Sequence, residues 1–204
     1  SCLQAARASS GGSSVPAGAT PLDPDEAAGL LPGHIATREQ LDEWEADNIL
    51  AGARWAAGRA RRRAILDDLF LRELHRRMFD RTWKWAGMYR AREKNIGVAP
   101  ERIAGDVRNL LEDTKTQLAA KVAPLDETAA RFHHRLVAIH PFSNGNGRHA
   151  RLMTDLLLEA NGAAPFSWGR SDLVRPGEAR ERYLAALRAA DARDFGPLLG
   201  FVRS

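Results

Sequence analysis

Residues 140–151 read HPFSNGNGRHAR and place a histidine, a glycine-rich turn and two arginines in one short stretch. The helix predicted in front of it, residues 127–139, has apolar residues three and four apart, as one face of a helix requires. Pro141 ends this helix, because a proline ring disfavours the helical conformation of the residue before it. His140 is therefore expected at the end of a helix, facing the loop that follows.

A glycine-rich loop and a second helix come after His140. Residues 143–147 tolerate positive φ, so successive backbone N–H groups can turn toward one point and form an anion-binding nest. Residues 148–159 are predicted to form a helix with a strongly apolar stripe, and Asn161-Gly162 ends it. The first turn of this helix directs its N–H donors at the loop.

Two arginines lie in that first turn. Arg148 and Arg151 are three residues apart and are therefore neighbours on one face. Two cations at the positive end of a helix dipole are unfavourable by about 0.3–1 kcal/mol each, and a bound di- or triphosphate compensates them through bidentate hydrogen bonds. His140, with an ordinary pKa of about 6.5, is mostly neutral at pH 7 and can take a proton from a hydroxyl beside the phosphate.

Each of these features also has a purely structural explanation. A Gly- and Asn-rich stretch is usually only a turn, a single histidine is usually satisfied within the fold or exposed, and two arginines often form a solvated face. Because all of them occur in twelve contiguous residues, a phosphate site with an adjacent base is the better interpretation.

The same twelve residues resemble the signature of Fic-domain (Fic/Doc) proteins, H-P-F-x-[D/E]-G-N-G-R-x-x-R. Surrounding segments further resemble the bacterial Fic subgroup called mobile mystery protein B: GATPLDPDEAAGLLPGHI, LDEWEADNI, TWKWAGMYR, EKNIGV and RFHHRLVAIHPF. The likeness extends over about residues 18–200. It implies an all-α fold, namely a Fic-type helical bundle with a short β-hairpin flap beside the active site.

The resemblance implies a protein nucleotidylyltransferase that moves AMP from ATP to a Ser, Thr or Tyr hydroxyl of a target protein. His140 is then the general base, and Phe142 is a buried anchor of the loop. Arg148 neutralises charge on the phosphates near the reacting centre, and Arg151 holds the γ-phosphate end. The residues that cradle the phosphates are Gly145, Asn146 and Gly147.

One position departs from the family pattern. Asn144 stands where the signature has the acidic residue that binds Mg²⁺. Its amide oxygen can ligate Mg²⁺ or Mn²⁺ but adds no negative charge, so weak metal binding is expected. Two alternatives stay open: a Fic-like transferase that uses another phosphate donor, and a catalytically silent module that binds nucleotide or protein.

The flap of the family is a short hairpin that aligns the target segment by strand addition. Residues 92–98 are the candidate, because helical periodicity lapses there and a glycine supplies a turn. Backbone pairing would bind an extended peptide with little demand on its sequence. The alternative is an ordinary connecting loop. The expected flap residues are Lys94, Asn95, Ile96 and Gly97.

Many family members are inhibited by a glutamate from an extra helix, which pairs with the second motif arginine and displaces the γ-phosphate. The usual marker of that helix, [S/T]-x-x-x-E-[G/N], has no clean copy in this chain. Thr37 and Gln40 form a capping box at a predicted helix start. Glu45 on this helix is expected to reach Arg151, with Glu43 as the second choice. The alternative is a plain solvated charge.

The 204 residues, 44% of them hydrophobic, favour one mostly helical domain at residues 20–204. Residues 1–19 are small, polar and aperiodic and are expected to be a disordered leader. No run is long and apolar enough to span a bilayer, so no membrane association is expected. Cys2 is the only cysteine, which fits a reducing cytoplasm without an internal disulfide.

Further helices are indicated by residues that recur with a period near 3.6. They are Leu41, Trp44 and Asn48; Ile65, Leu66, Leu69 and Phe70; Ile103, Val107, Leu110, Leu111, Thr114 and Leu118; and Tyr183, Leu184 and Leu187. The tryptophans are expected to be core and helix-packing residues. They are Trp44, Trp55, Trp83 and Trp85.

Two other classes of function fit parts of the sequence. The charge of +4, the pI of 9.7 and the run RARRR at residues 59–63 would suit a nucleic-acid-binding module. Since 26 acidic residues balance the arginines and no recognition motif accompanies them, a solvated basic face is the better interpretation.

A metal hydrolase is the second class. The sequence contains neither an H-x-x-x-H pair nor an HExxH, the usual zinc-binding motifs of such enzymes. The histidines of the hydrolase would be His133, His134, His140 and His149.

The subgroup resemblance adds one expected partner besides the target protein, a small helix-turn-helix protein. Nucleic acid itself is not expected to be a partner, for the reasons of charge balance given above.

Overall fold

The computed structural model describes residues 28–35, 37–59, 65–170, 173 and 177–204. The secondary structure of these residues is mainly helical, as expected, with α2 (Arg38–Ala57), α3 (Asp68–Phe79), α4 (Ile103–Ala120), α5 (Leu125–Ile139), α6 (Asn146–Ala160), α7 (Glu178–Asp191) and α8 (Gly196–Val202). Short 3₁₀ turns lie at Pro100–Arg102 and Trp168–Arg170. The expected leader, residues 1–19, and most of the basic run at 59–63 lie outside the described residues. Among the described helices, none combines the length and the apolar character that a bilayer span needs.

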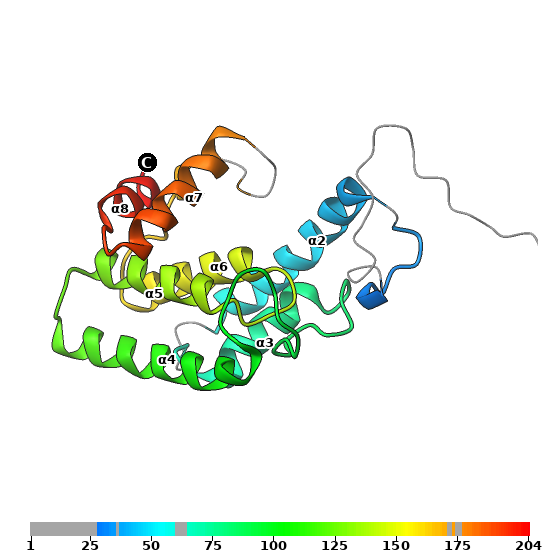
Figure 1. Cartoon of the computed structure of the whole chain (residues 1–204), viewed down its shortest axis with the longest axis horizontal. Helices are drawn as coiled ribbons and strands as arrows, with labels where there is room; N and C mark the ends of the chain where they lie inside the picture. Colours follow the sequence, from blue (N-terminus) through cyan, green and yellow to red (C-terminus); the bar gives the residue numbers. More distant parts are fainter. Residues whose placement is uncertain (1–27, 36, 60–64, 171–172, 174–176) are drawn as a thin grey trace, which may run out of the picture.

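The helices α5 and α6 lie side by side in the middle of the bundle (Figure 1). α5 also packs against α4 and α8, and α8 pairs with α7, whereas α2 and α3 pack on each other and on α6. Fully buried side chains fill the space between them, including Phe132 and Leu136 of α5 and Met153 of α6. The loop that joins α5 to α6 therefore connects two helices whose positions the core fixes.

Both helices around the motif begin and end close to the predicted residues. α6 starts two residues earlier than predicted, because Gly145 is its N-cap with φ +77° and so places Asn146 and Gly147 in the first turn. At the other end, Asn161 caps α6 and Gly162 follows with φ +79°. The Asn-Gly stop signal is thus confirmed.

α2 begins at the capping box that the sequence predicts. Thr37 Oγ1 accepts a hydrogen bond from Gln40 N at 3.3 Å, and Gln40 Oε1 accepts one from Thr37 N at 3.3 Å. The helix continues to Ala57, and among its few buried residues is an acidic one, Glu45. A buried carboxylate requires a partner, since an unpaired charge away from water is costly.

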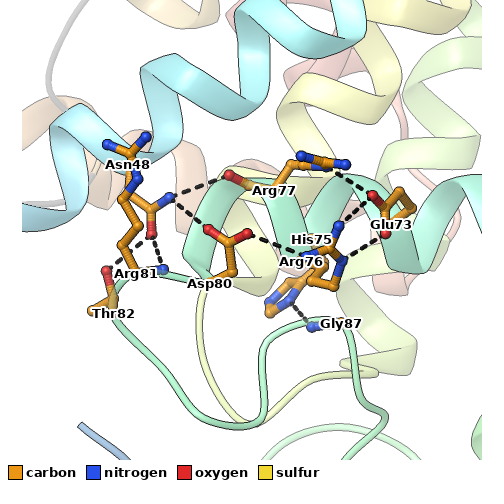
Figure 2. A network of polar contacts seen from close by, with 9 residues as sticks. All are labelled: Asn48, Glu73, His75, Arg76, Arg77, Asp80, Arg81, Thr82 and Gly87. Atoms are coloured by element: carbon orange, nitrogen blue, oxygen red, sulfur yellow. Dashed lines mark hydrogen bonds and ion pairs between the residues drawn. The ribbon is translucent and has the colours of Figure 1, made fainter. Parts of the chain in front are cut away.

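Asn48 attaches α2 to the C-terminal end of α3. Its Nδ2 donates to Arg77 O at 3.2 Å and to Asp80 Oδ1 at 3.3 Å. Its Oδ1 accepts from Arg81 N at 3.0 Å and from Thr82 Oγ1 at 3.2 Å (Figure 2). Asn48 is 1% exposed, so this set of bonds fixes the rotation of α2 and with it the position of Glu45, one turn earlier.

The tryptophans expected in the core are not all buried. Trp83 is 1% exposed and stacks on Trp85, with ring centroids 5.0 Å apart. Trp44 is 39% exposed, so the core position expected for it is wrong. Its indole N–H donates to Arg81 O at 3.3 Å from the surface side of α2, and this bond satisfies the polar atom without burial of the ring.

Candidate active site

His140 follows the last residue of α5 and has a left-handed backbone, with φ 53° and ψ 60°. The helix therefore ends where the sequence predicts. The conformation of His140 is unusual, however, because a residue before a proline is usually extended and not left-handed. The N–H of His140 still donates to Leu136 O, at 3.3 Å. A left-handed backbone costs a non-glycine residue about 1 kcal/mol or more, so the surrounding contacts must hold it.

The side chain of Asn146 closes the motif loop on itself. Its Oδ1 accepts from Phe142 N at 2.9 Å, and its Nδ2 donates to Phe142 O at 2.8 Å. Phe142 is fully buried and Asn146 is 4% exposed. The family resemblance assigns Asn146 to the phosphates, whereas the structure uses its amide group to shape the loop. The group that Asn146 can offer to a ligand is the backbone N–H in the first turn of α6.

Gly145 occupies a place that no other residue fits. Its φ of +77° is left-handed, and a Cβ atom there would lie 2.5 Å from Cζ of Phe79. Gly147 differs, because a Cβ atom on it would meet only Arg151 Nη1, at 3.7 Å. The backbone of the loop thus lies directly on an aromatic ring of α3.

His75, on α3, is a residue of the site that the sequence analysis missed. Its Nε2 lies 3.0 Å from Asn144 O, and its Nδ1 accepts the N–H of Gly87 at 2.9 Å; Figure 2 shows the second bond. The imidazole also stacks on Phe142, with ring centroids 3.7 Å apart. Burial lowers the pKa of His75 well below its ordinary value, so the ring is neutral and carries its proton on Nε2. Within the buried stripe of α3, no local sequence pattern distinguishes it.

Arg148, in the first turn of α6, donates from Nη1 to Oε2 of Glu45. Oε1 of the same carboxylate accepts the indole N–H of Trp83 at 2.7 Å. Glu45 is 1% exposed, and the Arg148 side chain is 17% exposed. The guanidinium also lies over the ring of Phe79, 5.1 Å from its centroid. The cation expected to bind phosphate is therefore already paired.

Arg151 faces α7 instead of α2. Its guanidinium carbon lies 6.0 Å from the ring centroid of Tyr183. Side chains three positions apart on a helix differ in direction by about 60°, so the two motif arginines meet different neighbours. The expected pairing of Glu45 with Arg151 is wrong, because Glu45 pairs with Arg148.

His140 is neutral over a wide pH range. Burial lowers its pKa to about 4, and the charges of Arg90 and Lys94 act in the same direction. The ring atom Nδ1 is buried, and a hydrogen bond with the backbone of Val137 acts in the opposite direction on the pKa without cancelling the effect of burial. A neutral imidazole can accept a proton, which is the requirement for a general base.

Residues 92–98 form a loop without strand pairing, so the expected β-hairpin flap is wrong for the described structure. Lys94, Asn95, Ile96 and Gly97 are all exposed, Ile96 by 62%. The carbonyl groups of Arg92 and Val98, at the two ends of the loop, accept hydrogen bonds from the side chain of Arg90. Since these bonds hold the ends, the loop does not need cross-strand pairs to keep its base closed.

The described residues contain no group of three or more His, Cys, Asp or Glu placed to hold a metal ion. Asn144 Oδ1 accepts the N–H of Gly145 at 2.6 Å. The histidines considered for a hydrolase have separate partners: His133 and Tyr183 Oη at 2.7 Å, His134 and Asp191 at 2.7 Å, and His149 and Leu71 O at 2.8 Å. This arrangement offers no support for metal-dependent hydrolysis.

Similarity to known proteins concerns this same part of the chain. Residues 65–158 match the model of the Fic/DOC family. The chain is 30% identical over 142 residues to protein adenylyltransferase fic-1 of Caenorhabditis elegans, a match that covers 67% of this chain and 26% of that protein. It is 31% identical over 142 residues to protein adenylyltransferase Fic of Nematostella vectensis, with 67% and 31% covered. The chain therefore spans less than a third of the length of these relatives.

Solved structures agree in fold. Fic-1 of Caenorhabditis elegans (residues 134–508) has a TM-score of 0.63 at 26% identity, covering 87% of this chain and 51% of that one. A Fic-domain signalling protein of Bacteroides thetaiotaomicron has a TM-score of 0.67 at 23% identity, with 80% and 68% covered. BepC of Bartonella tribocorum, solved with bound AMPPNP, has a TM-score of 0.65 at 19% identity, with 84% and 88% covered. The chain therefore contains a domain of the Fic/DOC family, at residues 65–158.

Proposed function

We propose that this chain transfers AMP from ATP to a serine, threonine or tyrosine hydroxyl of a target protein. The observation that carries the proposal is the position of His140, at the start of a loop that leads directly into the first turn of α6, with Arg148 in that turn and Arg151 in the next. The relatives named protein adenylyltransferase support it, because they are similar to two thirds of this chain.

The phosphates of ATP bind at the N-terminal end of α6. Backbone N–H groups of the first turn lack helical partners there, and the helix dipole is positive. Arg148 donates to the phosphates near the reacting phosphorus, and Arg151 donates to the γ-phosphate end. Gly145, Asn146 and Gly147 contribute backbone and not side-chain groups.

His140 acts as the general base through Nε2, since its other ring nitrogen, Nδ1, is buried. The oxygen of the target hydroxyl forms a bond to the α-phosphorus, and its proton passes to the imidazole. The bond from that phosphorus to the bridging oxygen of the β-phosphate breaks, and pyrophosphate leaves. Negative charge of the bound nucleotide would raise the pKa of His140 from its low value and so strengthen the base.

Glu45 restrains this reaction. Phosphates must compete with a buried carboxylate for the guanidinium of Arg148, and that carboxylate also repels them. The restraint acts on the first motif arginine. Glu43 lies on α2 as well but is exposed, so it takes no part.

The loop of residues 92–98 contacts the target protein. It is exposed, and a Cβ atom on its Gly97 would lie 2.7 Å from Cβ of His140, so the loop borders the base directly. Backbone groups of Lys94, Asn95 and Ile96 can bind an extended segment without a preformed hairpin.

A divalent cation, Mg²⁺ or Mn²⁺, enters with the nucleotide. The described residues do not build a metal site of their own, and Asn144 offers one amide oxygen that already accepts a backbone N–H. ATP phosphates would therefore supply most ligands, and binding would be weak without them. None of the steps above depends on the cation.

We infer membership of the mobile mystery protein B subgroup from sequence resemblance. Length and composition support a single domain at residues 20–204, and the single cysteine supports a cytoplasmic location. A small helix-turn-helix protein is then a second partner, besides the modified target.

Incubation of the purified chain with cell lysate, Mg²⁺ or Mn²⁺ and labelled ATP, UTP or GTP tests the proposal. Label from ATP should appear on a protein, His140→Ala should abolish it and Arg151→Ala should weaken it. His34→Ala, at an exposed position, is the matched control and should keep full activity. Label from another nucleotide would favour the alternative donor, and binding without label would favour a silent module. Unchanged labelling by His140→Ala would exclude its role as the base.

A further inference from the structure

Arg90 is 4% exposed, and its guanidinium binds main-chain carbonyl groups from two parts of the chain. Nε donates to His140 O at 2.7 Å, and Nη1 donates to Arg92 O at 2.9 Å. Nη2 donates to Val98 O and, at 3.5 Å, to Ile139 O. All four acceptors are backbone oxygens and none is a carboxylate, so these partners do not neutralise the buried positive charge.

The four carbonyls belong to two segments that the proposed reaction must keep in register. One segment is the end of α5, with His140, and the other is the loop of residues 92–98. Two backbone bonds run alongside the guanidinium: Arg90 N donates to Pro141 O at 2.9 Å, and Val98 N donates to Ile139 O at 3.2 Å. A single side chain thus joins both ends of the loop to the residue that carries the base.

We call the contact of Arg90 with the end of α5 and with the loop of residues 92–98 the junction. Gly97 lies directly against it. Its φ is +107°, and a Cβ atom there would lie 2.6 Å from Arg90 Nη2 and 2.7 Å from His140 Cβ. Only glycine fits both the backbone conformation and the space. The close approach of Gly97 to Arg90 and His140 therefore requires that the guanidinium and the loop keep fixed positions relative to each other.

His140 also needs an external restraint, because its left-handed backbone is unfavourable for a residue with a side chain. Arg90 Nε donates to the carbonyl oxygen of His140, which belongs to the peptide group directly after this strained position. Loss of that bond would let the residue relax, and the direction of the imidazole would change with it.

We propose that Arg90 is a positioning residue for the transfer reaction, which fixes the backbone of His140 and the target-facing loop of residues 92–98 relative to each other. Its effect on rate rests on the proposed adenylyl transfer, whereas its effect on the structure does not. Arg90 touches neither ATP nor the target hydroxyl. It acts through His140 and the loop.

The test compares Arg90→Lys with Arg108→Lys, a matched change at an exposed position of α4. Lysine keeps the charge but lacks the planar fork and cannot reach four carbonyls. With ATP as the probe, Arg90→Lys should change the dissociation constant by less than about twofold. It should lower kcat of labelling and raise KM for the target, by about tenfold in kcat/KM. Arg108→Lys should change none of these values.

The rate of amide hydrogen exchange at Val98 measures how stable the junction is, and it does not require an enzymatic assay. The rate should rise about tenfold in Arg90→Lys, because the N–H bond to Ile139 O loses its support, and should stay constant in Arg108→Lys. The ring signals of His140 should shift in the same variant. An unchanged Val98 rate and unchanged His140 signals would overturn the proposal. A tenfold loss of ATP affinity would also overturn it, by showing a general role in folding.

Gly97→Ala tests the same junction if Arg90→Lys does not fold. The added methyl group displaces the guanidinium and the Cβ of His140, whereas Gly105→Ala on α4 meets nothing within 4 Å. Gly97→Ala should raise Val98 exchange and lower kcat with ATP affinity retained, and Gly105→Ala should do neither.

If the wild-type chain labels no protein, the proposed function fails, but the exchange rates and ring signals still decide whether Arg90 holds the junction. Val98 exchange unaffected by Gly97→Ala would contradict it.

Discussion

The carboxylate of Glu45 on α2 binds the guanidinium of Arg148 in the first turn of α6, 103 residues later in the chain. The indole N–H of Trp83 donates to the other carboxylate oxygen at 2.7 Å. Because Glu45 is almost completely buried, this ion pair is protected from water and salt. The arginine that we propose binds phosphate is therefore paired with a carboxylate from outside the family motif.

Replacement of Glu45 should open the phosphate site. Glu45→Gln keeps an acceptor for Trp83 but removes the negative charge, so the affinity for ATP should rise about tenfold. Titration calorimetry with ATP measures the change, and labelling of the target should increase with it. Glu43→Gln, on the exposed side of α2, is the control. Equal ATP affinities in the two variants would contradict the restraint.

Activity should persist at acid pH. His140 has a pKa of about 4 instead of 6.5, and the base works in its neutral form, above that pKa. The acid limb of kcat/KM should therefore have its midpoint near pH 4, with little change between pH 5 and 7. A profile of kcat/KM against pH, together with the NMR titration of the ring, measures it. A midpoint near 6.5 would show that the ring is more exposed to water than the structure has it.

The stability of the fold should fall as the pH falls below about 6.5. Burial lowers the pKa of His149 to about 4 and that of His133 to about 3, and His75 is shifted in the same direction. The unfolded chain binds protons at these groups before the folded chain does, so acid favours unfolding by about 1.4 kcal/mol per pH unit for each proton. Asp155 acts the other way between its ordinary pKa of 3.8 and about 6, because burial raises its pKa.

Urea unfolding at several pH values measures this dependence. The free energy of unfolding should decrease from pH 6.5 to pH 4, and His149→Gln should remove the part that one proton contributes. Glutamine can still donate to Leu71 O, the partner of His149. Identical pH slopes for the variant and the parent chain would contradict a buried neutral His149.

Gly145→Ala should damage the motif loop more than a matched change elsewhere. The methyl group would collide with the Phe79 ring at 2.5 Å, in addition to a backbone cost of about 1 kcal/mol for a left-handed alanine. Gly162 has nearly the same φ, +79°, but open space around it, so Gly162→Ala should lose only the stability that the backbone conformation costs and should cause no clash. Thermal unfolding should show a larger loss for Gly145→Ala, and ATP affinity should fall only in that variant. Equal losses in both would mean that the loop shifts easily away from Phe79.

Asn144→Asp should strengthen the metal dependence of nucleotide binding. Aspartate can still accept the N–H of Gly145, and it adds the charge that hard cations prefer. The affinity for ATP should rise about tenfold with Mg²⁺ and should not rise in EDTA. A gain in EDTA as well would point to a change in the loop instead of a metal ligand.

Local signals predicted the framework of the site well. The ends of α5 and α6 follow from apolar periodicity, Pro141, Gly145 and the Asn161-Gly162 stop, all of which act on neighbours in the chain. The fully buried position of Phe142 and the capping box of α2 agree with the sequence as well. The left-handed backbone of His140 does not follow from these rules, which consider only neighbours in the chain, whereas Arg90 and Gly97 lie against His140 from distant positions.

Residues that act from outside the motif were missed. His75 and Arg90 carry no recognisable pattern in their own segments, yet each binds backbone groups of the motif loop or its border. The hairpin expected at residues 92–98 was wrong for a related reason. A side chain closes the base of this loop, and a hairpin prediction considers only the backbone pairing of the segment with itself.

The sequence by itself determined the helical class, the helix–loop–helix around residues 140–151 and the placement of its glycines and Arg148 where the two helices meet. Caps, proline and glycine set these features through residues only a few positions away. The tertiary structure alone decided that Glu45 meets Arg148, that Arg151 faces Tyr183 and that Arg90 joins the base to the loop. Such contacts depend on the rotation and the packing of whole helices, which no short stretch of sequence encodes.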